Sequence, residues 1–245
     1  MFKIVLSDNS LFKEAFESIS HIIDEIVCII DSEGFRVNAI DRGHICFVSF
    51  NLKYNVFDEF ICDAPTKVAI DTNEFHKILK RMKKTDILTL ESDAGNFIIK
   101  LDGDANREFK LRLIDVDYEI PEMPNIDYDV SIDVPSNVVN DALTDVFLFS
   151  EKADFMIDED YLTIRTIGDF GDGEIKYLHG EEVNQVVKSI FDIRKLTDIF
   201  RASKFSNQLN MKLGNDVPIT LTFTLPSGDG SIGFLLAPRL EQEED

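Results

Sequence analysis

The sequence predicts an α+β fold made of two copies of one domain, each an antiparallel β-sheet layer covered on one face by two helices. Strand-like segments with alternating apolar residues and many β-branched and aromatic side chains dominate the chain. Four segments carry apolar residues on one side at helical spacing, as expected for helices that lie on a sheet. The order strand, helix, several strands, helix, several strands occurs twice within 245 residues. This repetition indicates an internal duplication.

The first half contains two expected helices, Ser10–Ile23 and Asp71–Lys84, with apolar stripes that include Phe16 and Phe75. Turn residues such as Asp31-Ser32-Glu33-Gly34 separate the strand-like segments. The expected strands of this half are Lys3–Leu6, Val27–Ile30, Phe35–Ile40, Ile45–Leu52, Lys67–Ile70, Ile87–Glu91, Asn96–Leu101 and Glu108–Ile114.

The second half repeats this organisation with two expected helices, Pro135–Ser150 and Asp192–Lys204, whose stripes include Leu143 and Phe200. The expected strands are Asp129–Val134, Asp154–Asp158, Leu162–Thr166, Glu174–Leu178, Asn184–Ile190, Leu209–Leu213, Ile219–Thr224 and Ser231–Leu236.

Matched segments define the two copies. The matches are Asp31–Val37 with Asp158–Ile164, Ile70-Asp71 with Phe191-Asp192, and Phe109–Leu113 with Gly233–Ala237. Between the copies, Ile114–Asp129 is rich in acids and contains Pro121 and Pro124, which is typical of an extended linker. We therefore expect domains at residues 1–114 and 130–245, joined by residues 115–129, with an acidic tail at the end of the second domain.

Composition and motifs argue against several functional classes. No apolar run approaches the roughly 20 residues that cross a bilayer, so we expect a soluble intracellular protein. The three cysteines, Cys28, Cys46 and Cys62, lack C-x-x-C spacing and predict reduced thiols rather than disulfides or zinc ligands. Nucleotide-binding and hydrolase motifs are absent from the sequence, and the four histidines are scattered. We expect no catalytic residue, no metal and no cofactor.

The positive charges are concentrated on helices. The chain has a net charge of −21, with 25 basic and 46 acidic residues, yet the four expected helices together carry more basic than acidic residues. Lys77, Lys80, Arg81 and Lys84 lie opposite the apolar stripe of one helix, and Arg194, Lys195, Arg201 and Lys204 do so on its repeat partner. A solvated polar face would explain one such helix. Two basic helix faces at equivalent positions of the repeat favour contact with the phosphates of a nucleic acid, independent of its base sequence.

A second set of candidate residues is apolar and lies outside the helices. It comprises Ala39–Phe47, the linker residues Tyr118, Ile120 and Met123, and Phe234–Arg239. Core packing is one interpretation. The alternative is an exposed binding surface, because a linker that only spans needs no Tyr, Ile or Met, and Pro238 ends the last strand early.

Several motifs in this sequence occur together in one order. They are Met1-Phe2, Ala39-Ile40-Asp41-Arg42-Gly43-His44-Ile45, Phe75-His76-Lys77-Ile78-Leu79-Lys80, Leu113-Ile114-Asp115-Val116-Asp117 and Leu236-Ala237-Pro238-Arg239-Leu240-Glu241. Together with the duplication, they resemble the proliferating cell nuclear antigen (PCNA) family, the sliding clamps of archaeal and eukaryotic DNA replication. The resemblance runs from Met1 to Glu241, and length and acidity are closer to the archaeal members.

The resemblance implies the DNA clamp fold and a specific assembly. Three two-domain subunits would close head to tail into a homotrimeric ring whose helices line a central hole and whose sheets face outwards. Such a ring encircles double-stranded DNA without sequence preference and has no catalytic activity. It tethers DNA polymerase and recruits the clamp loader, flap endonuclease and DNA ligase through a short peptide with a Gln and paired aromatics. An archaeal clamp would be cytoplasmic and associated with the nucleoid, and a eukaryotic one would be nuclear.

The family's functional positions fall on particular residues of this chain. The DNA-facing positions are Lys13, Lys77, Lys80, Arg81, Lys84, Arg201 and Lys204. The partner-peptide positions are Ile40, His44, Ile45, Phe47, Tyr118, Ile120, Pro121, Phe234, Leu235, Ala237 and Pro238. Ring closure would join the edge strands Arg107–Ile114 and Asp172–His179. Helix Pro135–Ser150 departs from a basic lining, since it carries Asp141 and Asp145 and neither Lys nor Arg.

Two alternatives stay open at this stage. The chain could be one subunit of a heterotrimeric or checkpoint-type clamp. In a different class, it could be a nuclease that uses clustered acids such as Asp115 and Asp117 to bind Mg²⁺. With 46 acidic residues in the chain, such spacing is expected by chance.

Overall fold

The computed structural model describes residues 1–93, 95–115 and 119–239. These residues form two compact units. Unit 1 contains Met1–Met123 together with Leu225–Ile232, and unit 2 contains Pro124–Thr224 and the chain from Gly233 onward. A hairpin from the C-terminal half of the chain therefore belongs to unit 1.

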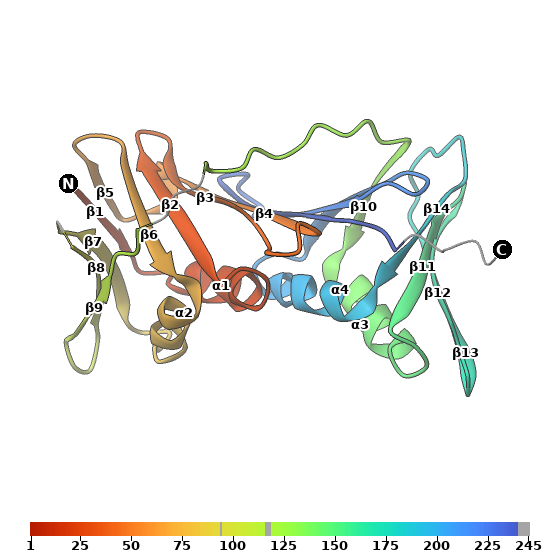
Figure 1. Cartoon of the computed structure of the whole chain (residues 1–245), viewed down its shortest axis with the longest axis horizontal. Helices are drawn as coiled ribbons and strands as arrows, with labels where there is room; N and C mark the ends of the chain where they lie inside the picture. Colours follow the sequence, from red (N-terminus) through yellow and green to blue (C-terminus); the bar gives the residue numbers. More distant parts are fainter. Residues whose placement is uncertain (94, 116–118, 240–245) are drawn as a thin grey trace. The chain divides into compact units, whose positions relative to one another are not determined.

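Unit 1 contains two groups of antiparallel strands (Figure 1). The first sheet has the order β5-β1-β7-β8-β9, with β1 at Phe2–Leu6, β5 at Glu59–Cys62, β7 at Ile87–Ser92, β8 at Asn96–Asp102 and β9 at Arg107–Arg112. The second has the order β4-β3-β2-β6, with β2 at Glu25–Asp31, β3 at Gly34–Ile40, β4 at Cys46–Lys53 and β6 at Thr66–Asp71. The first residues of β17 (Gly230–Leu236), which belong to unit 1, lie next to β4.

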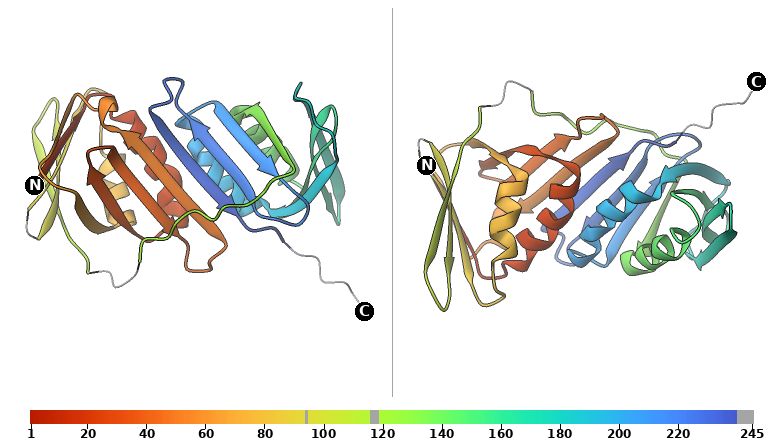
Figure 2. Two further views of the ribbon diagram at one scale, coloured as in Figure 1. Left: turned by 90° about the horizontal axis from the view of Figure 1, so that it is seen from above. Right: turned by 60° about the horizontal axis from the view of Figure 1, so that its bottom comes forward.

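Two helices, α1 (Ser10–Ile22) and α2 (Thr72–Lys80), lie side by side in unit 1 (Figure 2). A short 3₁₀ turn, η1, spans Tyr54–Val56. The helices bury their apolar stripes in a core rich in phenylalanine, where Phe16 and Phe75 meet edge to face at 4.8 Å between ring centroids. Asp71 begins α2 by accepting a hydrogen bond from the Glu74 amide at 2.9 Å.

Unit 2 has the same plan (Figure 1). One set of strands has the order β10-β15-β16-β17, with β10 at Val130–Pro135, β15 at Gln208–Leu213 and β16 at Ile219–Thr224. The other has the order β13-β12-β11-β14, with β11 at Lys152–Ile157, β12 at Tyr161–Gly168, β13 at Gly171–Leu178 and β14 at Val187–Asp192. Helices α3 (Ser136–Val146) and α4 (Ile193–Phe200) lie side by side, and a 3₁₀ turn, η2 (Arg201–Lys204), follows α4.

The two-copy α+β architecture predicted from the sequence is confirmed, with differences at element ends. Helix α2 ends at Lys80 and α3 at Val146, earlier than predicted, although Met82 continues the buried stripe of α2. Strand β5 was not predicted, because it is only four residues long, has no buried residue and shows weak alternation. None of the helices in the described ranges is long and apolar enough to cross a membrane.

Backbone hydrogen bonds align the two copies and correct one predicted match. The amide of Ile114 donates to the Ala69 carbonyl at 3.0 Å in unit 1, and the amide of Arg239 donates to the Ile190 carbonyl at 2.7 Å in unit 2. Ala69 and Ile190 each stand two residues before the capping Asp of the second helix. Ile114 therefore corresponds to Arg239, and β9 corresponds to β17 with Phe109 at the position of Phe234. The predicted match of Phe109 to Gly233 was one residue too early.

Candidate functional site

The basic face of unit 1 combines the end of α2 with the loop that follows it. Lys77, Lys80, Arg81 and Lys84 are exposed there, and the opposite side of the helix is buried. Lys77 forms an ion pair with Glu74 at 2.5 Å, and this hydrogen bond raises the pKa of the lysine. Lys77 is therefore partly neutralised by its own helix.

Lys13 lies on α1 but is tied to the same loop. Its Nζ donates a hydrogen bond to the Met82 carbonyl at 3.2 Å, and the side chain is half-buried. A lysine that caps the end of a neighbouring helix stabilises its carbonyl groups. The structure thus brings Lys13 beside the α2 positions, with a bond that holds the two helices together.

The loop after α2 is fixed by a buried carboxylate that was not predicted. Asp86 is 1% exposed, accepts a hydrogen bond from the Lys83 amide at 2.7 Å and forms an ion pair with Arg107 at the start of β9. Arg107 also donates to the Arg81 carbonyl at 3.0 Å, and Asn9 donates to the Lys83 carbonyl at 2.8 Å. Because three elements converge on this loop, its backbone is preorganised. The only sequence signal is that Asp86 follows the basic run Lys83-Lys84 after one intervening residue, Thr85.

The equivalent face of unit 2 is less basic. Arg201 and Lys204 lie in η2, and Arg201 is held by Asp198 at 3.3 Å. Helix α3 beside them exposes Asp141 and Asp145. The structure therefore places five of the predicted DNA-facing positions in unit 1 and two in unit 2.

A histidine is buried between α1 and α2. His76 is 4% exposed, neither ring nitrogen has a hydrogen-bond partner among the described residues, and Nε2 lies 3.7 Å from a Glu17 carboxylate oxygen. Burial lowers the pKa of His76, and the nearby Lys80 lowers it further. The ring is therefore uncharged at neutral pH and adds nothing to the basic face.

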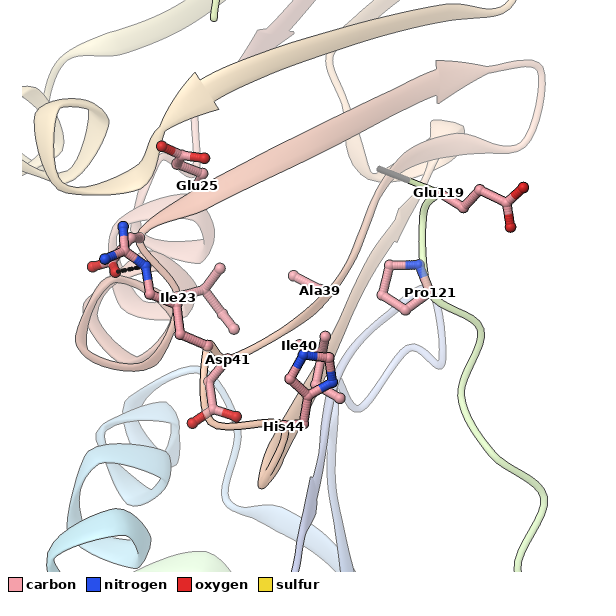
Figure 3. Close-up of a pocket in the computed structure, with 10 residues that line it drawn as sticks. Ile23, Glu25, Ala39, Ile40, Asp41, His44, Glu119 and Pro121 are labelled. Carbon is pink, nitrogen blue, oxygen red and sulfur yellow. Dashed lines mark ion pairs between the residues drawn. The ribbon is translucent and has the colours of Figure 1, made fainter. Parts of the chain in front are cut away.

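A pocket of about 480 Å³ opens on the surface of unit 1 (Figure 3). Ile23, Ala39, Ile40, His44 and Pro121 supply much of its lining. The charged residues around it are mostly acidic: Asp24, Glu25, Asp41, Arg42 and Glu119. Its chemistry suits an apolar group that enters past a negative rim.

The loop on one side of this pocket has a fixed conformation. The buried Asp41 carboxylate accepts hydrogen bonds from the Ile45 and Cys46 amides at 2.8 and 2.9 Å. His44 adopts a positive φ of 54°, which a side chain tolerates when the surrounding contacts determine it. Arg42 pairs with Asp24 at 3.1 Å. These contacts hold His44 against the pocket.

The predicted partner-peptide residues have different surroundings. Ile40, His44 and Pro121 line the pocket, and Ile45 follows His44 with 41% exposure. Phe47 is buried, so its contribution is packing, and Tyr118 lies outside the described residues. Ile120 is half-buried. Of the four predicted residues that belong to unit 2, Phe234 and Leu235 are buried, whereas Ala237 and Pro238 are half-buried.

Sequence reasoning did not identify which residues form the acidic rim. Asp24, Glu25 and Glu119 come from a helix–strand junction and from the linker. In a chain with 46 acidic residues, the sequence does not indicate which individual carboxylates surround a pocket. Across the described ranges, no cluster of three or more His, Cys, Asp or Glu side chains could hold a metal ion.

Comparison with known proteins covers nearly the whole chain. Residues 1–122 match the family model of the proliferating cell nuclear antigen N-terminal domain, and residues 122–239 match that of its C-terminal domain. A DNA polymerase sliding clamp from Methanobrevibacter smithii is 46% identical over 244 residues, with 100% of both chains covered. One from Methanothermobacter thermautotrophicus is 42% identical over the same length and coverage. The crystal structure of PCNA from Thermococcus kodakaraensis superposes with a TM-score of 0.90 at 26% identity, covering 98% of this chain and 100% of that one.

Proposed function

The chain belongs to the proliferating cell nuclear antigen family, and we propose that it is a DNA polymerase sliding clamp that closes as a ring of three identical copies around duplex DNA. The observation that carries this proposal is the full-length match to archaeal relatives named DNA polymerase sliding clamps. The two-unit fold with a basic helical face supports it.

The free edges of the sheets support ring closure. Strand β9 ends the first sheet of unit 1, and β13 ends the second sheet group of unit 2. Exposed apolar side chains surround β13: Leu148 after α3 is 77% exposed, and Phe170 in the β12–β13 turn is fully exposed. A free edge flanked by apolar groups is suited to pairing with another copy. One chain carries two different edges, so head-to-tail closure needs only one kind of subunit.

DNA contact in this proposal is made by the basic faces. Lys80 at the end of α2 and Arg81 and Lys84 in the anchored loop after it are exposed in unit 1. Lys204 adds a charge in unit 2. Lysine and arginine on a helix face bind backbone phosphate and carry no base specificity. Binding should be weak and independent of sequence, and retention on DNA should come from encirclement.

Partner proteins would bind the pocket of unit 1. Its apolar lining takes an anchor side chain, and its acidic rim suits basic residues beside that anchor. We propose that DNA polymerase, the clamp loader, flap endonuclease and DNA ligase present a peptide with a Gln and paired aromatics to it. The clamp itself performs no chemistry in this scheme, and its place of action is the cytoplasm, at the nucleoid.

Topology provides the decisive test. The clamp is loaded onto closed circular DNA, and retention is measured before and after the circle is cut once. We expect stable retention on the circle and rapid loss after linearisation. Equal retention on both forms would contradict encirclement. Light scattering of the free protein should give the mass of three copies, and a monomer at tens of micromolar would favour a heterotrimer.

A further inference from the structure

Unit 1 contains a short strand that has no counterpart in unit 2. Strand β5 (Glu59–Cys62) pairs with β1 at the end of the first sheet of unit 1. It lies in the connection between β4 and β6, residues 54–65. The equivalent connection of unit 2 joins β13 to β14, is shorter (residues 179–186), and is described throughout without a strand. Strand β10 is therefore the last strand of its sheet among the described residues, whereas β1 has a partner on each side.

Strands β1 and β10 correspond residue by residue. Leu6 of β1 pairs with Leu88, and Val134 of β10 pairs with Leu209. Leu88 and Leu209 are separated by the same number of residues as the Asp residues that cap the second helices of the two units, so Leu6 corresponds to Val134. The residues of β10 that correspond to the four residues paired with β5 are Val130, Ser131, Ile132 and Asp133.

The outward backbone groups of β10 lie on the side that β5 occupies in unit 1. The Ser136 amide donates to the Asn207 carbonyl at 3.1 Å, and bonded pairs alternate along an antiparallel ladder. Ser131 and Asp133 therefore direct their N–H and C=O groups away from β15. In unit 1, the corresponding carbonyl of Val5 accepts a hydrogen bond at 2.9 Å from the amide just before β5. The position that β5 fills in unit 1 is thus open at β10 in the part of the chain that the structure describes.

A proline limits the length of a strand that could pair with this edge. Pro135 has no N–H and follows Asp133 on the same outward side of β10. Prolines and charged side chains on an edge prevent long strands from pairing with it. The stretch that corresponds to the residues paired with β5, Val130–Asp133, ends before the proline. A strand as short as β5 is therefore accommodated, and a longer one is not.

A hollow of about 600 Å³ adjoins β10 on the exposed face of the sheet. Side chains of β10, β15 and β16 line it, and Asp133 is the charged one among the described residues around it. The Asn210 side chain donates to one Asp133 carboxylate oxygen at 2.8 Å. Gln208 beside them is exposed and adds a further amide oxygen. A lysine or arginine side chain, which carries only hydrogen-bond donors, fits this lining.

The charges near this edge favour a basic segment. In unit 1, Lys3 of β1 forms an ion pair with Glu59 of β5 at 2.7 Å. At β10 the position of Lys3 is taken by Ser131, and the exposed charge is Asp133. The two acidic residues nearest before β10 are exposed as well. Because the whole chain carries a net charge of −21, a basic segment is attracted on approach and an acidic one is repelled.

We propose that β10 is a docking edge for an extended basic segment of a partner protein, which adds to the sheet as an antiparallel strand in the position that β5 holds in unit 1. The pairing of β1 with β5 gives its register. The first residue of the segment lies opposite Asp133 and places its positive charge over the hollow, because directly opposite residues share a face. The second and fourth residues lie opposite the buried residues Ile132 and Val130 and are apolar. This inference goes beyond the proposed clamp function and does not rest on it.

Peptide binding to the full-length wild-type protein tests the charge selection. The probe is a fluorescein-labelled peptide with the central sequence Lys-Phe-Thr-Val, and the matched control has Glu in place of Lys. In fluorescence anisotropy, the control should bind at least about ten-fold more weakly than the probe. Asp133→Lys should reverse the preference between the two peptides. Equal affinity of the wild-type protein for both peptides, or no binding of the probe at millimolar concentration, would overturn the proposal.

Backbone methylation distinguishes a paired strand from a purely electrostatic contact. The third peptide residue lies opposite Ser131 and directs its N–H towards β10, whereas the N–H of the second points away. Methylating the third nitrogen should abolish binding, and methylating the second should change the affinity by less than about two-fold. Equal effects of the two methylations would show that the peptide does not pair with β10.

Two protein variants make the same comparison from the other side. Ser131→Pro removes the outward N–H, and Ser131→Ala keeps it. The proline variant should bind the probe at least about ten-fold more weakly, and the alanine variant should bind it like the wild type. The melting transition and the oligomer mass serve as folding controls. If the proline variant does not fold, the methylated peptides on the wild-type protein still decide the question.

Discussion

Units 1 and 2 share one backbone plan but hold the loop after their second helix by different chemistry. In unit 1 the buried Asp86 carboxylate binds Arg107 and the Lys83 amide. In unit 2 the equivalent position, just before β15, is Asn207, whose side-chain oxygen accepts hydrogen bonds from the Asn137 amide and the Ser136 hydroxyl at 3.2 and 3.3 Å. Apolar core positions and the capping Asp of the second helix repeat between the units, whereas the side chains that anchor the loop have diverged. Packing therefore sets the fold, and surface charge is free to specialise one copy for phosphate contact.

The largest expected effect concerns the apolar residues of the two units proposed for peptide binding. Ile45 of unit 1 is 41% exposed, whereas Leu235 of unit 2 is 8% exposed. Leu235→Asp buries an unpaired carboxylate and should lower the free energy of unfolding by about 4 kcal/mol. Ile45→Asp should leave the melting transition nearly unchanged and abolish binding of a Gln-and-aromatic peptide in calorimetric titration. Undiminished peptide affinity in Ile45→Asp would move the binding site elsewhere.

The second effect compares the two loop anchors. Asp86→Ala leaves Arg107 and the Lys83 amide without their acceptor and should cost about 2–3 kcal/mol in denaturant unfolding. Asn207→Ala removes neutral hydrogen bonds and should cost about 1 kcal/mol. Equal costs would mean that the charged anchor contributes no more than the neutral one.

DNA contact should weaken more when the charges of unit 1 are reversed. Lys80→Glu with Arg81→Glu removes two exposed cations, and the slope of log K against log salt should fall by about 1.8. Arg201→Glu with Lys204→Glu should reduce it by less, because Arg201 is already paired with Asp198. The control is the oligomer mass, which should be that of the wild type in both variants. A larger loss from the unit 2 pair would reverse the comparison.

The smallest effect is a pH dependence of stability that the buried histidine of unit 1 should cause. The pKa of His76 is lowered in the folded state, mainly by burial, so the unfolded chain takes up a proton first as pH falls. The stabilisation is complete above the ordinary histidine pKa of about 6.5 and is lost below it. His76→Gln should flatten the fall in unfolding free energy between pH 7 and pH 5. An identical pH profile in both proteins would exclude His76 as its source.

The sequence was sufficient for the repeat, the element types and the apolar stripes, because these depend on local period. The predicted helix ends were less accurate. Met82 is buried although α2 ends at Lys80, so the apolar stripe continues beyond the last residue of the helix. The basic positions were recognisable as a repeated pattern, but their anchors Asp86 and Arg107 meet only through tertiary contact. Phe47 and Phe234 were predicted to lie at a surface and are buried, since alternation does not reveal which face of a strand is covered.

The hairpin that completes unit 1 has a consequence for how the protein is made. Unit 1 begins at Met1 but includes Leu225–Ile232, with the Lys53 amide bonded to Asp229. At synthesis rates of about 5–20 residues per second, the N-terminal part waits on the order of ten seconds for this hairpin to leave the ribosome. Until then, the β4 edge of the nascent chain is open to pairing with other nascent chains. Ribosomes that translate one message in close succession would hold several such open edges near one another.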